Sequence, residues 1–332
     1  LDVDNRLEIR SPSSEQVDPP PSRGKIKLLP RGNQRLRFLD VKDSHASGLT
    51  LVATAALGSV DSGNNLNWEF QFATLMWDGT EDANWSNPNN WDLGMVPIAG
   101  DSVIIPGGVL QPIVDAGADL TIQLKTLTLE SGGDPLASLT LNGHNLVVTE
   151  TADNSGIINA QGSATVTIAT LNNYEEGNIN FKNVSNLSIT AAVNNSGQID
   201  FNGSTTVTMT TVNNANGGNM DFAPVTTLTI TGTLNNSGTI HFNESGTITI
   251  ATLSNTETGI IYLNGNEHIQ IATPDTDSGT FYFEGDMDAG ASVFTLSGDV
   301  PGYYHIIFSA RDGNQDVFET SSDLNVFGNI TF

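Results

Sequence analysis

Cysteine is absent from the 332-residue sequence, which excludes disulfide bonds, thiol catalysis and cysteine-ligated metal sites. No apolar run approaches the ~20 residues that a membrane-spanning helix needs. Good helix formers are scarce beside abundant Asn, Thr, Gly and Ser, a composition that favours β-strands joined by many turns. There is also no Gly-rich phosphate loop, no His-x-x-x-His pair and no convincing Ser/His/Asp set, so we expect a protein that is not an enzyme.

Positive charge is scarce after Lys42. The formal net charge is −25, and nine of the twelve basic residues precede residue 43. From there onward, 31 acidic residues stand against Lys125, Lys182 and Arg311. Such a surface repels phosphate backbones and anionic lipids, so we expect no nucleic-acid binding and no direct membrane insertion. Divalent cations or a basic partner fit the acidic surface better.

A glycine recurs about every 20 residues, and successive spacings alternate between two values that differ by one residue. The recurring glycines are Gly156, Gly177, Gly197, Gly218, Gly238, Gly259 and Gly279. Apolar residues stand two and four positions after each glycine, and again ten and twelve positions after the first six. Apolar residues two apart with polar residues between them are typical of half-buried strands. A fifth apolar position, at Leu171, Val193, Val212, Leu234 and Leu253, predicts a shorter third strand after a turn.

Units of this size cannot bury an apolar face alone, but stacked units can, with each strand bonded in parallel to its copy about 4.8 Å away. The sequence therefore predicts an all-β parallel β-helix, or β-solenoid, with about 20–21 residues per coil. Because the turns alternate in length, we expect a longer repeat of two coils, about 41 residues. The alternative, a β-sandwich, would not require identical spacing of four inward positions.

Two parts of the chain differ in composition. Residues 1–72 contain most of the positive charge and the linker-like stretch SPSSEQVDPPPSRG, and we expect a smaller β-rich block there. Residues 73–332 are predicted to form the β-helix, which is most regular at residues 154–285. Residues 100–150 show the same alternation and predict earlier coils, while the C-terminal stretch predicts coils of irregular register.

A tryptophan cluster opens the predicted β-helix in the stretch MWDGTEDANWSNPNNWDLGMVPIAGDSVIIPGG. It resembles the W-x-G…W-x-x-P-x-N-W…P-x-x-G-D-x-V-x-I signature found where β-helical blocks begin in very long secreted bacterial surface proteins. The stretch FLDVKDSHASGLTLVATAALGSVDSGNNLNWEF is similar to the segment that ends such blocks. The resemblance implies a right-handed β-helix of an extracellular adhesin or surface filament, and it implies no catalytic residues.

The order of these segments predicts self-association. A block-ending segment stands first and an unfinished β-helix stands last, so we expect one period of a tandem or head-to-tail array. Unpaired strand edges at an open β-helix end need a cap or a neighbour. Because the first residue is Leu rather than Met, we also expect the chain to be a processed or excised piece.

The cluster Trp77, Trp85 and Trp91 has two interpretations. Rings flanked by Asn and Asp can stack on a sugar, which would make a surface glycan a partner. Alternatively, the rings plug the end of the β-helix core, as large amphipathic side chains do when their N–H finds an acceptor. We favour the plug.

A column of outward residues three positions after the glycine contains Asp200, Asp221 and His241. Stacking would bring the two carboxylates about 4.8 Å apart, a separation that suits a retaining glycosidase or, with the histidine, a cation site. We expect neither a nearby basic residue nor a cleft beside them. A solvated polar face is therefore the favoured interpretation.

Two further surface features have candidate functions. Paired threonines such as Thr208 and Thr229 form an outward column that resembles ice-binding β-helices, although Asn186, Ser188, His268 and Gln270 interrupt it. Calcium is the ligand we would expect if the protein binds one, at Asp275 and Asp277 or at Asp286 and Asp288. Turn chemistry explains these aspartates equally well.

These patterns together predict an extracellular structural or adhesive β-helix module that acts as one unit of a filament, fibre or surface array. A carbohydrate-binding or carbohydrate-cleaving β-helix is the first alternative, and an ice-binding protein is the second.

Overall fold

The computed structural model describes residues 7–10, 26–28, 39–42, 44–46, 51–54, 59–61, 63–285, 292–296, 300, 302–309, 316–320 and 323–332. This part of the chain is β-structure with one short 3-10 helix, η2 (Pro88–Asn90). The linker-like stretch at residues 11–24 and the predicted calcium ligands Asp286 and Asp288 lie outside the described residues. No helix in the described part is long and apolar enough to cross a membrane.

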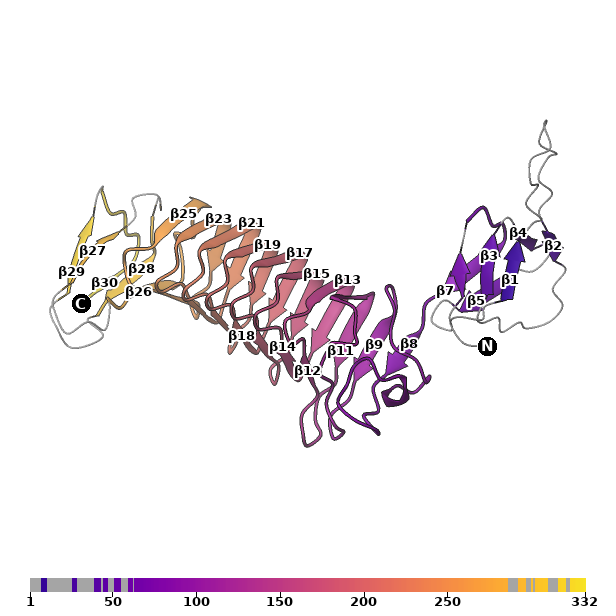
Figure 1. The fold of residues 1–332 in the computed structure, drawn as a ribbon. Coiled ribbons are helices and arrows are strands. Elements are labelled where there is room, and N and C mark those ends of the chain that lie inside the picture. The colour runs from indigo at the N-terminus through magenta and orange to yellow at the C-terminus, as the bar shows by residue number, and fades with distance from the viewer. Residues whose placement is uncertain are drawn as a thin grey trace, which may run out of the picture.

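Two long parallel sheets run side by side along a rod (Figure 1). In spatial order the first contains β8 (Thr74–Met76), β9 (Ser102–Ile105), β11 (Thr126–Leu129), β13 (Asn145–Asn154), β15 (Thr165–Asn173), β17 (Asn186–Asn195), β19 (Thr206–Asn214), β21 (Thr227–Asn236), β23 (Thr247–Asn255) and β25 (His268–Thr273), and β10 (Thr121–Leu124) also pairs with β13. The second contains β12 (Ser138–Thr140), β14 (Ile157–Asn159), β16 (Asn178–Asn180), β18 (Gln198–Asp200), β20 (Asn219–Asp221), β22 (Thr239–His241), β24 (Ile260–Leu263), β26 (Thr280–Phe283), β28 (His305–Phe308) and β30 (Ile330–Thr331). The predicted parallel β-solenoid is thus confirmed, while its right-handedness stays a prediction.

The two ends of the chain also contain parallel strand pairs. In the N-terminal block, β3 (Leu39–Lys42) lies between β1 (Leu7–Arg10) and β6 (Val60–Asp61), β2 (Ile26–Leu28) pairs with β4 (Ser44–Ala46), and β5 (Leu51–Thr54) pairs with β7 (Trp68–Gln71). Near the C-terminus, β27 (Val293–Leu296) pairs with β29 (Val317–Thr320). Both ends therefore share the pairing geometry of the rod.

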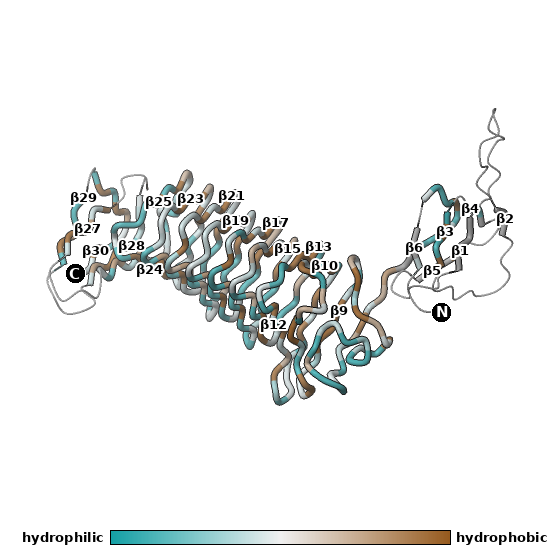
Figure 2. The backbone as a smooth tube through the Cα atoms, viewed as in Figure 1, coloured by the Kyte–Doolittle hydropathy of each residue, from teal (hydrophilic) through white to brown (hydrophobic). Residues whose placement is uncertain are grey.

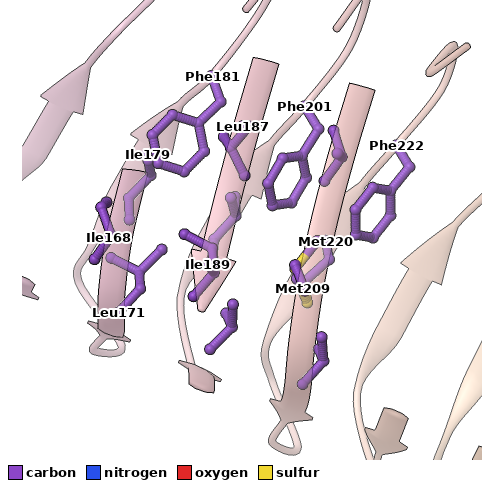
Figure 3. Close-up of a cluster of buried hydrophobic side chains, with 14 of the residues drawn as sticks. Ile168, Leu171, Ile179, Phe181, Leu187, Ile189, Phe201, Met209, Met220 and Phe222 are labelled. Carbon is purple, nitrogen blue, oxygen red and sulfur yellow. The ribbon is translucent and has the colours of Figure 1, made fainter. Parts of the chain in front are cut away.

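The interior of the rod is built from the predicted apolar positions. Hydrophobic and hydrophilic residues alternate along each coil in Figure 2, because every second side chain of a strand points inward. Figure 3 shows the result, with Phe181, Phe201 and Phe222 on successive coils. Their ring centroids lie 5.6 and 4.4 Å apart, and the second pair is stacked in parallel planes. All the inward positions predicted from the glycine spacing are buried.

The predicted short third strand is not a separate element. In β13, β15, β17, β19, β21 and β23 it continues the preceding strand, and the pairing register shifts where the two segments meet. Such a bulge bends a strand without interrupting its ladder for long. The expectation of a turn between the two segments was therefore wrong. The strands continue through a bulge, at which alternate coils contain one extra residue.

Buried asparagines form a ladder of hydrogen bonds along the rod. Each donates Nδ2 to Oδ1 of the next at 2.8–2.9 Å. They are at most 2 % exposed, and we call them the inner ladder: Asn154, Asn173, Asn195, Asn214, Asn236 and Asn255. The residues that precede the first five members form an outer ladder on the surface, in which Asn235, Asn213, Asn194 and Asn172 donate in the opposite direction, ending on the carboxylate of Asp153.

The recurring glycine lies against the inner ladder. A Cβ on Gly238 would overlap the carbonyl oxygens of Gly218 and Ala215 on the preceding coil. Equivalent overlaps with backbone or asparagine atoms occur at Gly177, Gly197, Gly218 and Gly259. Only glycine therefore allows the coils to approach one another at this corner.

The two-coil repeat is visible at another corner. Ser163, Ser204 and Ser245 are buried on alternate coils, and Val184 and Val225 occupy the coils between them. The hydroxyl of Ser204 donates to the carbonyl of Phe181 at 2.7 Å, and that of Ser245 donates to Phe222 at 2.8 Å. A serine on every second coil thus bonds to the coil before it, which makes two coils the structural period.

Candidate functional site

The tryptophan cluster closes the N-terminal end of the solenoid core. Trp77, Trp85 and Trp91 are 0, 1 and 2 % exposed, and Trp91 contacts the other two rings edge to face at centroid distances of 5.1 and 4.8 Å. Nε1 of Trp77 donates to the carbonyl of Leu110 at 2.6 Å, and Nε1 of Trp91 donates to that of Trp85 at 3.0 Å. Trp77 and Trp91 also form an antiparallel bridge beside β8. We call residues 77–105 the cap.

A fully buried asparagine organises the cap loop. Oδ1 of Asn90 accepts the backbone N–H of Glu81 and of Asp82 at 3.0 and 3.1 Å. Its Nδ2 donates to the carboxylate of Asp82 at 2.8 Å and to the carbonyl of Asn84 at 3.1 Å. Four hydrogen bonds from one side chain hold the loop that carries the tryptophans. The role of Asn90 was not predicted, although it is the Asn of the W-x-x-P-x-N-W motif.

The last part of the motif joins the cap to the first coil. Asp101 is buried, and its two oxygens accept the N–H groups of Ala73 and Ile98, each at 2.9 Å. Burial raises the pKa of this carboxyl above its ordinary value, although the two N–H donors oppose that shift. Gly79 has φ +57, and a Cβ there would overlap the Leu110 carbonyl that accepts the Trp77 bond. These motif residues therefore have structural roles in the cap.

Stacking of a sugar on these tryptophans is not supported by their positions. Each ring lies in the core and contacts another tryptophan, so no ring face is open to a ligand. The cluster also lies on the first coils, whereas Asp200 and Asp221 lie on β18 and β20, several coils further along the rod. The two features do not form one site.

Tryptophan fluorescence checks the plug interpretation. Because three of the four tryptophans are buried, we expect blue-shifted emission that iodide quenches weakly in the native state and strongly in 6 M guanidinium chloride. Adding soluble polysaccharides should leave the spectrum unchanged. Efficient quenching of the native protein, or a spectral shift on adding a glycan, would show that the rings are accessible.

The outward column has the predicted register. Asp200 is paired with Asp221, and Asp221 is paired with His241, on adjacent strands. The side chains are half-buried on the open face of the second sheet. His241 stacks on Tyr262 at 4.7 Å with an interplanar angle of 11°, and Tyr262 lies 5.1 Å from Tyr282. These rings cover one another's faces, so the column offers edges rather than faces to a ligand.

A basic residue does accompany the aspartates, contrary to the prediction. Nζ of Lys182 lies 2.7 Å from Oδ2 of Asp200, and the hydrogen bond and charge of Asp200 raise the pKa of Lys182 above its ordinary value. Asn202 donates to Oδ2 of Asp221 at 3.2 Å. Lys182 lies two residues beyond Asn180, which pairs with Asp200 on the next coil. Stacking by one coil thus places Lys182 near Asp200 but does not show that the two side chains meet. The pairing compensates the charge of one aspartate and leaves no free pair of carboxylates.

The Lys182–Asp200 pair should contribute little to stability. Its side chains are 41 and 27 % exposed, and ion pairs of this kind contribute up to about 1 kcal/mol. We therefore expect Lys182→Met to change the free energy of unfolding by less than about 1 kcal/mol, with a smaller difference at 0.5 M NaCl. Chemical denaturation at both salt concentrations measures this, and a loss above about 2 kcal/mol would indicate a larger role for the pair.

The threonine columns lie on the outer face of the first sheet. Thr208 pairs with Thr229, and Thr229 pairs with Thr249, whereas Ser188 and Gln270 occupy the same column on other coils. The interruptions predicted from the sequence are therefore present in the stacked structure.

The predicted calcium ligands near residue 275 act as turn acceptors. Oδ2 of Asp275 accepts the N–H of Asn255 at 2.7 Å, and its Oδ1 accepts the N–H of Asp277 at 3.1 Å and of Ser278 at 3.3 Å. Both carboxylate oxygens are thus engaged with donors that a cation would have to displace. Within the described residues, no group of three or more His, Cys, Asp or Glu side chains is placed to hold a metal ion.

The geometry defines a parallel β-solenoid protein with an aromatic N-terminal cap. A family model described as a domain of unknown function (DUF8693) matches residues 76–191, which include the cap and the first coils. Comparisons with curated proteins and with solved structures found no match.

Proposed function

We propose that the protein is an extracellular structural or adhesive module, one unit of a head-to-tail filament, fibre or surface array. The observation that carries this proposal is that the residues repeated from coil to coil serve to hold the coils together. The glycines, the inner asparagines and the inward Ile, Leu and Phe side chains all join one coil to the next. Because the repeated residues serve to stack the coils, the chain acts through its length and stiffness.

Charge supports the head-to-tail arrangement. Residues 1–42 contain nine basic and six acidic side chains, whereas residues 286–332 contain seven acidic side chains and Arg311. Opposite charges at the two ends favour a contact between the end of one unit and the start of the next. The neighbouring unit lies either on a second copy or further along the same polypeptide, and the contact is the same in both cases.

Strand pairing supports the same arrangement. At one end β30 is an edge strand of the ten-stranded sheet, and at the other β1 and β2 are edge strands of parallel sheets. Parallel edges can extend a solenoid by adding further parallel strands. The edge of β8 is less accessible, because Met76 and Asp92 bond across it and the Trp77–Trp91 bridge covers it. We therefore propose contact through the N-terminal block rather than through the cap.

Sedimentation velocity and negative-stain electron microscopy test the proposal together. We expect association that increases with protein concentration between 1 and 100 μM, weakens from 50 to 500 mM NaCl, and yields linear particles on the grid. Replacing Lys25, Lys27, Arg31 and Arg35 with glutamine should reduce association without changing the melting temperature of the solenoid. A sharp monomer over the whole concentration range at 50 mM NaCl would contradict end-to-end contact between copies.

A further inference from the structure

One corner of the solenoid near its C-terminal end contains an excess of buried oxygen atoms. In the described part of the chain, six buried side-chain N or O atoms have no hydrogen-bond partner. Three of the six belong to this corner: Oδ1 of Asn243, Oδ1 of Asn264 and Oδ2 of Asp316. Asn243 and Asn264 are only 7 and 6 % exposed. A buried acceptor without a donor is costly, so three in one place require an explanation.

The coil register brings these residues together. Asn243, Asn264 and Glu284 directly follow the inward residues Phe242, Leu263 and Phe283, so they occupy equivalent positions on three successive coils. Nδ2 of Asn243 donates to Oε1 of Glu284 at 3.3 Å across the intervening coil, so the Glu284 side chain lies over Asn264. A Cβ on Gly285, which has φ +67, would overlap Oδ2 of Asp316. Asp316 therefore lies beside the backbone that follows Glu284.

The orientation of Asn243 is determined by its neighbour. If its amide were rotated by half a turn, Oδ1 would face the carboxylate oxygen of Glu284 and two acceptors would be opposed. The NH₂ group must therefore face Glu284. The unpartnered Oδ1 atom is a consequence of the carboxylate and not an arbitrary choice of rotamer.

A second carboxylate at the corner has a different role. Glu267 is buried, and its oxygens accept the N–H groups of Glu244, Asn264 and Gly265 at 3.1, 2.9 and 2.8 Å. These three bonds fix the backbone turn that carries Asn264. Glu267 thus positions the corner and has no need of a further partner.

We propose that Asn243, Asn264, Glu284 and Asp316 form a binding site for a single calcium ion. Two carboxylates and two amide oxygens are the hard oxygen ligands that Ca²⁺ prefers, with water completing its six to eight ligands. The strongly negative chain attracts divalent cations to its surface, and the ion neutralises both carboxylates in a buried corner. Three coils contribute ligands, and bound calcium links these coils to the strand pair β27 and β29. This proposal is independent of the proposed function.

Calorimetric titration of the full chain with CaCl₂ in 150 mM NaCl tests the site, with MgCl₂ as the competing probe. We expect one equivalent of calcium with a dissociation constant on the order of 10⁻⁴–10⁻³ M and weaker binding of magnesium. Glu284→Gln keeps an acceptor for Asn243 and should weaken calcium binding by about tenfold or more, because ligand charge sets affinity. Asn264→Asp adds a ligand charge and should tighten binding several-fold. Asp277→Asn is the matched control and should bind calcium like the wild type.

Melting curves with EDTA and with 5 mM CaCl₂ separate binding from folding. Calcium should raise the melting temperature of the wild type and of Asp277→Asn but not that of Glu284→Gln, and all three should melt alike in EDTA. Absence of stoichiometric binding by the wild type overturns the proposal, as does binding that Glu284→Gln leaves unchanged.

Discussion

Asn214→Ala should lower the free energy of unfolding by about 3–5 kcal/mol, because it removes several buried hydrogen bonds at once. Nδ2 of Asn195 loses its 2.8 Å acceptor, and Oδ1 of Asn236 loses its 2.9 Å donor. The carbonyls of Gly218 and Thr239 each lose a bond from the same amide. Water cannot replace these bonds, since Asn214 is buried.

The adjacent residue provides a matched control. Asn213 belongs to the outer ladder, where its Nδ2 donates to Asn194 at 2.8 Å and its Oδ1 accepts from Asn235 at the same distance. Because solvent reaches this ladder, we expect Asn213→Ala to cost less than about 1 kcal/mol. Urea denaturation followed by circular dichroism compares the two variants. Equal losses would show that the inner ladder has no special role.

Gly238→Ala should destabilise the solenoid by about 3–5 kcal/mol, because the added methyl group overlaps backbone oxygen atoms on the preceding coil. Neither carbonyl can move without breaking its own hydrogen bonds along the stack. The unfolding midpoint in urea measures the loss.

Gly217→Ala is the corresponding control. Gly217 has φ +89 and no heavy atom within 4 Å of a built Cβ, so its substitution costs only the backbone strain of about 1–2 kcal/mol. If both variants lose the same stability, then conformational preference rather than close approach explains the recurring glycine.

The inward positions of most coils could be predicted from the sequence, because every coil repeats the same spacing of apolar residues. The positions of Ile240, Phe242, Ile248 and Ile250 followed from their spacing after Gly238, and all four are buried. Periodicity is a dependable signal when one face of each strand must be apolar. The bulge between the second and third strands was missed, because a one-residue change of register leaves the apolar spacing almost unchanged.

The inner ladder could have been found in the sequence. Its members are asparagine on all six coils, whereas the outer position changes to Asp153 and Ser254 at the ends of the series. A turn position tolerates such changes and a buried amide ladder does not. The two members of each Asn-Asn pair therefore differ in how constant they are from coil to coil, and this difference distinguishes the buried position from the surface position.

Contacts between side chains on different coils were harder to predict. Lys182 and Asp200 lie on neighbouring coils, and their pairing depends on how long side chains lie across the two. The corner formed by Asn243, Asn264 and Glu284 also depends on side-chain direction, because one of its bonds crosses an entire coil. Spacing alone does not reveal such geometry.

Deletion of one complete two-coil repeat tests the central claim most directly. Removing residues 198–238 joins Gly197 to Thr239 and preserves the glycine, asparagine and serine registers. We expect this variant to fold and to melt in one transition within about 5 °C of the full chain, because each coil contacts only its neighbours. Removing residues 198–227, one and a half coils, should abolish folding, since Leu228 would then follow Gly197. The claim would be contradicted if the two deletions had the same effect on the melting curve.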